Sequence, residues 1–66
     1  MKIDTEYLKL DSFLKAVNAV ASGGEAKMAI QDGFVIVNNE VETRRGRKLR
    51  PGDTVEIKGG ARYSVE

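Results

Sequence analysis

The sequence predicts an α+β domain in which two short helices pack on a small antiparallel sheet. Apolar residues in the first half recur at the three- and four-residue spacing of helices. The second half consists of short runs rich in β-branched residues, and turn residues separate these runs. A length of 66 residues allows one domain with a thin core, so we expect a single domain over residues 1–66.

The chain is expected to begin with a strand and a helix. Residues 1–10 alternate loosely, with Ile3 and Tyr7 as the β-branched and aromatic members, which favours a short strand. Residues 11–21 place their apolar side chains on one helical stripe. Asp11 is the expected N-cap, because its carboxylate can accept hydrogen bonds from the free amides of the first turn.

A second helix is predicted to follow after a tight turn. Ser22 and Glu25 have the spacing of a capping box, and the glycine pair between them ends the first helix. The second helix should run to about Asp32, and Gly33 should end it. Its inner face should consist of Ala26, Ala29 and Ile30.

The remaining residues are predicted to form antiparallel strands at 34–37, 40–43, 54–57 and 61–65. Asn38 and Asn39 should connect the first two strands, because asparagine tolerates the left-handed backbone conformation. The other turns are expected at Pro51-Gly52-Asp53 and Gly59-Gly60.

The four aromatic residues are expected to serve the core rather than a ligand. Phe13 and Phe34 lie in apolar patterns, and so small a core also has use for Tyr7 and Tyr63. Proteins that bind single-stranded nucleic acid normally interleave aromatic residues with their cations. The expected burial therefore argues against a platform on which bases stack.

The charges are unevenly distributed, although the net charge is only +1. Four lysines and seven acids give residues 1–43 a charge of −3, and two cations and three acids give residues 51–66 a charge of −1. Residues 44–50 hold five cations and no acid, a charge of +5. Such a cluster indicates a phosphate-binding surface, because the planar guanidinium group matches phosphate oxygens in pairs. A solvated loop that keeps the protein soluble is the alternative.

The composition excludes most catalytic chemistry. The chain has no histidine and no cysteine, so it lacks the usual general base, the commonest metal ligands and any thiolate. It has neither the glycine-rich dinucleotide motif nor the phosphate loop of nucleotide-binding enzymes. No apolar stretch is long enough to span a bilayer, and no signal-peptide pattern is present. We expect a cytoplasmic, non-enzymatic binding domain with no catalytic residue, metal, cofactor, membrane contact or small-molecule substrate.

Several motifs occur in an order that is specific when they are taken together. They are Lys9-Leu10-Asp11 before the first helix, Ser22-Gly23 with Ala26 at the second, G-F-V-I-V-N-N at residues 33–39, and L-R-P-G-D-T-V at residues 49–55. This order resembles the S-four RNA-binding domain, also called the alpha-L motif, over residues 9–57. Lys9 and Gly23 stand where that family has arginine, and Asn39 replaces its hairpin glycine. Residues 23–27 and 42–49 are most similar to the short stand-alone bacterial group typified by YaaA and YbcJ.

The resemblance implies an RNA-binding domain whose contacts come from the two helices and the adjoining β-loop. The expected partner is structured RNA, in particular ribosomal RNA or a ribosome-assembly intermediate, read by shape through its backbone and 2′-hydroxyls. The alternative is a protein-interaction adaptor that docks an acidic partner through the same basic loop. The oligomeric state is left open. The expected RNA-binding residues are Lys9, Lys15, Ser22, Lys27, Arg44, Arg45, Arg47 and Lys48.

Overall fold

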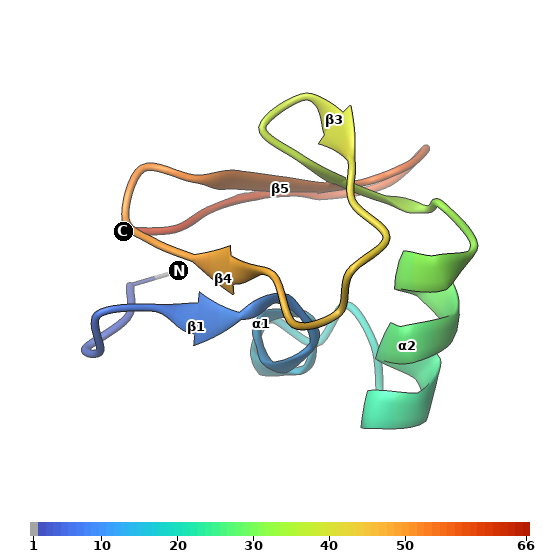
Figure 1. Ribbon diagram of the computed structural model, residues 1–66, viewed down its shortest axis with the longest axis horizontal. Coiled ribbons are helices and arrows are strands. Elements are labelled where there is room, and N and C mark those ends of the chain that lie inside the picture. Colours follow the sequence, from blue (N-terminus) through green and yellow to red (C-terminus); the bar gives the residue numbers. More distant parts are fainter. Residues whose placement is uncertain (1) are drawn as a thin grey trace.

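The computed structural model describes residues 2–66 and consists of two helices packed with two small antiparallel sheets (Figure 1). The α+β class predicted from the sequence is therefore confirmed. The helices are α1 (Leu10–Ala16) and α2 (Gly23–Gln31). The strands are β1 (Leu8–Lys9), β2 (Val35–Val37), β3 (Glu40–Val41), β4 (Lys48–Leu49), β5 (Thr54–Ile57) and β6 (Arg62–Ser64).

Helix α2 has the boundaries that the sequence predicts. Ser22 is its N-cap, and the Ser22 hydroxyl oxygen accepts a hydrogen bond of 3.2 Å from the Glu25 N–H. Asp32 is the C-cap, and Gly33 follows with a positive φ of 80°. Glycine adopts a left-handed backbone conformation at lower steric cost than other residues, so Gly33 ends the helix as expected.

Helix α1 differs from the prediction at both ends. It starts at Leu10, and its N-cap is Lys9, so the prediction that Asp11 is the N-cap is wrong. The helix also stops at Ala16 rather than continuing to residue 21. Asn18 adopts a left-handed φ of 60°, and the Ala19 N–H donates to the Leu14 carbonyl at 2.9 Å, which closes a Schellman-type end.

The strands form a four-stranded sheet and a separate two-stranded ribbon. The sheet has the order β3-β2-β5-β6, and every neighbouring pair is antiparallel. Asn38 and Asn39 both have positive φ values, 51° and 70°, so the tight β2–β3 turn forms as predicted. The ribbon pairs β1 with β4, with Leu8 opposite Leu49 and Lys9 opposite Lys48.

The N-terminal strand is shorter than predicted. Only Leu8 and Lys9 pair with a partner, whereas the expected strand covered residues 1–10. Ile3 is half-buried and its N–H donates to the Glu66 carbonyl at 3.1 Å, but it is not part of a strand. Met1 lies outside the described residues. Loose alternation cannot create a strand by itself, because β4 offers pairing partners to only two residues.

The core lies between the helices and the inner face of the four-stranded sheet. Phe13 is fully buried and makes an edge-to-face contact with Tyr63, with ring centroids 6.1 Å apart. Phe34 is 50% exposed, so its expected place in the core is wrong. It precedes β2, whose alternation turns the neighbouring Val35 inward. The buried set comprises Leu10, Phe13, Leu14, Val20, Ala26, Ile30, Val35, Val37, Leu49, Val55 and Val65.

Within residues 2–66, neither helix combines the length and the apolar character that crossing a membrane would require.

Candidate nucleic-acid interface

The basic segment, residues 44–50, is tied to the first helix by its backbone. The Leu10 N–H donates to the Arg47 carbonyl at 2.8 Å, and the Asp11 N–H donates to the Arg45 carbonyl at 3.1 Å. These bonds satisfy amides that begin α1, which explains how the helix starts without a side-chain cap. Figure 1 shows the chain descending from β3 to the start of α1 before it enters β4. The side chain of Leu49, in β4, is fully buried and anchors the C-terminal end of the basic segment in the core.

A buried carboxylate organises the arginines of the segment. Glu42 is only 7% exposed. Its Oε2 accepts from the backbone N–H and the Nε of Arg44 at 3.1 and 3.0 Å. Its Oε1 accepts from Arg44 Nη2 at 3.1 Å and from Arg47 Nη1 at 3.0 Å. The Arg44 fork thus pairs with both oxygens of one carboxylate, which is the strongest form of charge-assisted hydrogen bond.

The electrostatics of Glu42 follow from these contacts. The side-chain hydrogen bond from Arg44 is the largest cause that lowers the pKa of Glu42 from 4.5 to about 2. Burial acts in the opposite direction, and the bond from Arg47 adds to the lowering. Glu42 is therefore ionised at neutral pH. Its own backbone is held by the hairpin, because the Glu42 N–H donates to the Val35 carbonyl at 2.9 Å.

The sequence pattern assigns Glu42 no role beyond the negative charge of residues 1–43. A usable signal was present, because Glu42 and Arg44 are two residues apart in an extended segment, where side chains at this spacing share one face. The spacing does not predict that the Glu42 carboxylate is buried, because its burial depends on how the basic segment packs against the rest of the fold.

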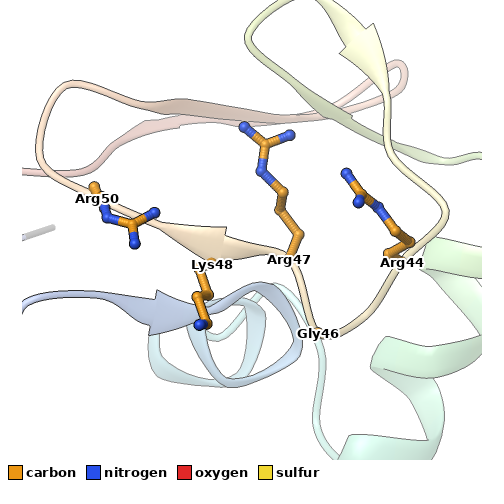
Figure 2. A pocket seen from close by; sticks show the side chains of 5 residues that line it. All are labelled: Arg44, Gly46, Arg47, Lys48 and Arg50. Carbon is orange, nitrogen blue, oxygen red and sulfur yellow. The ribbon is translucent and has the colours of Figure 1, made fainter.

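Four of the five cations of the segment line an open hollow of about 540 Å³ (Figure 2). The figure shows Arg44 and Arg47 directed to one side of the chain, and Lys48 directed to the other side, toward β1. The Arg44 side chain is 75% exposed and that of Arg47 is 30% exposed. Glu42 uses only some of their five N–H donors each, so both arginines retain donors for a ligand. The lining residues are Arg44, Gly46, Arg47, Lys48 and Arg50.

The two-stranded ribbon adds a pair of like charges beside the hollow. Lys9 and Lys48 are direct cross-strand partners, and both are exposed. Like charges in this position destabilise a sheet. Among the described residues, neither lysine forms a salt bridge that would relieve the repulsion. An anionic partner would relieve it.

The structure brings together only some of the residues expected from the sequence. Arg44, Arg47 and Lys48 line the hollow, and Lys9 lies opposite Lys48. Arg45 is exposed on the same loop but does not line the hollow.

The other expected residues lie on or next to the helices. Lys15 is exposed in the last turn of α1, and Lys27 is exposed on α2. The Ser22 hydroxyl is engaged in capping α2. Arg50 is not among the expected RNA-binding residues, although it belongs to the cluster at 44–50, and it also lines the hollow.

The described residues, 2–66, contain no group of three or more carboxylate, histidine or cysteine side chains that could hold a metal ion. The charged side chains that line the hollow are all cations. Two carboxylates lie beside them: Glu42 accepts from Arg47, and Asp53 accepts from the Arg50 N–H at 2.8 Å. Four cations against two acids leave a positive charge, so the arrangement suits an anionic ligand.

Comparison with known proteins gives consistent matches. A family model described as the S4 domain matches residues 1–66. The chain is 46% identical over 65 residues to the "Probable ribosome maturation protein RlbA" of Bacillus subtilis (strain 168), which covers 98% of this chain and 92% of that protein. It is 40% identical over 53 residues to the "Putative RNA-binding protein YbcJ" of Escherichia coli (strain K12), which covers 80% of this chain and 76% of that protein.

Proposed function

This chain belongs to the S4 domain family, the S-four family that its motifs resemble, and we propose that it binds structured RNA without catalysing a reaction. The observation that carries the proposal is the basic segment, which places four of its five cations around one hollow. Its backbone is docked on α1, and the buried Glu42 carboxylate holds Arg44 and Arg47. The names of the two relatives, one an RNA-binding protein and one a ribosome maturation protein, support RNA as the partner.

The side chains of this surface are suited to contacts with the RNA backbone rather than to sequence-specific contacts with the bases. Arginine and lysine side chains neutralise phosphates and release counterions, which drives binding whatever the sequence. An A-form helix presents phosphates and 2′-hydroxyls along a wide, shallow minor groove, so a rigid basic surface can recognise its shape. The hydrogen bonds that Arg44 and Arg47 donate to Glu42 limit the side-chain freedom that binding would otherwise have to remove.

Within this proposal the RNA is ribosomal RNA or a ribosome-assembly intermediate, and the protein acts in the cytoplasm. The support is the name of the Bacillus subtilis relative, a probable ribosome maturation protein. We infer that Lys9, Arg45 and Lys48 contact phosphates together with Arg44 and Arg47. Lys15 on α1 and Lys27 on α2 are proposed to contact the RNA at the periphery of this surface, together with Ser22 at the N-terminus of α2.

The salt dependence of RNA binding tests the proposal. Lys9 and Arg45 are the best residues to replace, because neither side chain pairs with a described residue, whereas Arg44 also holds Glu42. In the double variant Lys9→Ala/Arg45→Ala, the slope of log affinity for an RNA duplex against log salt should fall by about 1 for each lost phosphate contact. Fluorescence anisotropy at several salt concentrations measures this slope.

A matched control removes two cations from elsewhere. Lys58 and Arg62 are exposed, and Arg62 lies on β6, at the opposite edge of the sheet from β3. The variant Lys58→Ala/Arg62→Ala should keep the wild-type slope. Equal slopes for wild type and Lys9→Ala/Arg45→Ala would refute the assignment. Failure to bind RNA, together with capture of an acidic protein from nuclease-treated lysate, would support the adaptor alternative instead.

A further inference from the structure

The outer face of the β1–β4 ribbon carries an aromatic residue among its cations. Side chains alternate along a strand, and Leu8 and Leu49 turn toward the core, where Leu49 is fully buried. Lys9 and Lys48 therefore face outward. Continuing the register by one pair places Tyr7 beside Arg50, two residues from the lysines and so on their face.

Contacts in the structure agree with this placement. Lys48 Nζ lies 4.8 Å from the centroid of the Tyr7 ring, and Arg50 Cζ lies 5.9 Å from it. Both distances are within the range of cation–π attraction. Tyr7 is 36% exposed, unlike Tyr63, whose ring packs against the buried Phe13. The expectation that all four aromatic residues serve the core therefore fails at Tyr7 as well as at Phe34.

An exposed ring among cations is the arrangement on which unpaired bases stack, because every base has a π-face and every nucleotide has a phosphate beside it. Arg50 connects this ring to the hollow, since it both approaches Tyr7 and lines the hollow with Arg44 and Arg47. The two features thus form one continuous surface. One part of it is suited to the backbone of a duplex, and the other to a base that has left the stack.

We propose that Tyr7 stacks on one unpaired base of the bound RNA while Lys48, Arg50 and Lys9 contact the phosphates on either side of it. This inference rests on the proposed function and names the class of RNA: a duplex interrupted by an unpaired nucleotide. In the free protein the two cations lie over the Tyr7 ring. Both are exposed on flexible stems, so they can turn to the phosphates and leave the ring to the base.

The test compares the affinities of the full chain for two RNAs, a fully paired duplex and the same duplex with a single bulged adenosine. The wild-type protein should bind the bulged RNA more tightly. Tyr7→Ala should weaken binding of the bulged RNA about 5- to 100-fold and leave the paired duplex within about twofold. Tyr7→Phe retains the ring and should retain the preference. Tyr7→Leu serves as a second variant with an apolar side chain, in case the alanine variant does not fold.

The outcomes separate this inference from the proposed function. Equal wild-type affinity for the two RNAs would overturn the stacking site and leave the duplex-binding function intact. The stacking site is also overturned if Tyr7→Ala and Tyr7→Leu weaken both RNAs equally, or if Tyr7→Phe loses the preference. Failure of the wild-type protein to bind either RNA would overturn both the function and the inference.

Discussion

Replacing Glu42 by glutamine should destabilise the protein without removing a cation from its basic segment. The carboxylate accepts four hydrogen bonds from Arg44 and Arg47, and an amide of the same shape has one oxygen fewer and places an N–H group against arginine donors. A pKa lowered from 4.5 to about 2 corresponds to at most about 3 kcal/mol. Because Arg44 is 75% exposed, solvent screening reduces the expected loss to about 1–2 kcal/mol.

The pH dependence of unfolding distinguishes this cause from a general packing defect. The pKa of Glu42 is lower in the folded state, so its contribution is complete above about pH 4.5 and is lost as the pH falls through about 2. Urea unfolding of wild type and Glu42→Gln should therefore differ by about 1–2 kcal/mol at pH 7, and the difference should shrink toward pH 2. A difference that stays constant over this range, or no difference at pH 7, would refute the reasoning.

The remaining predictions concern the framework that holds the site. Asn38→Ala should lower the free energy of unfolding by about 1–3 kcal/mol, because it removes side-chain hydrogen bonds and places alanine at a φ of 51°. The Asn38 side chain donates to Asp53 at 3.0 Å and accepts from the Thr54 N–H at 2.9 Å. Asn39→Gly, at a φ of 70°, is the matched control and should change the free energy of unfolding by less than about 0.5 kcal/mol. An equal loss of stability in both variants would contradict the role assigned to the hydrogen bonds of the Asn38 side chain. Leu49→Ala should cost about 2–5 kcal/mol in urea unfolding, since the side chain is fully buried. As a control, Met28→Gln should leave the free energy of unfolding nearly unchanged, because Met28 is exposed. A similarly small loss of stability in Leu49→Ala would show that the core does not anchor β4.

Local chemistry accounts for the parts of the fold that the sequence predicts well. Ser22 caps α2 and Gly33 ends it through bonds and backbone angles within a few residues. The hairpin turn depends likewise on two adjacent asparagines. The start of α1 could not be predicted in this way, because the carbonyls of Arg45 and Arg47 that receive its first amides lie more than 30 residues away in the chain.

The candidate site shows the same division. Clustered charge identified the basic segment without any knowledge of the fold. The roles of Glu42 and Tyr7 depend on docking: Glu42 becomes buried where the hairpin meets the segment, and Tyr7 gains its cations only when β1 pairs with β4. Local sequence patterns do not reveal such pairings. The burial of Glu42 and the exposure of Tyr7 therefore could not be predicted.

Backbone amide shifts of the labelled protein, recorded while the bulged RNA duplex is added, test the central claim most directly. If RNA binds at the basic segment, the largest shifts should fall on residues 44–50 and on Lys9, and β6 should change little. Shifts centred on β6, or no shifts at RNA concentrations that saturate binding, would contradict the assignment of this surface.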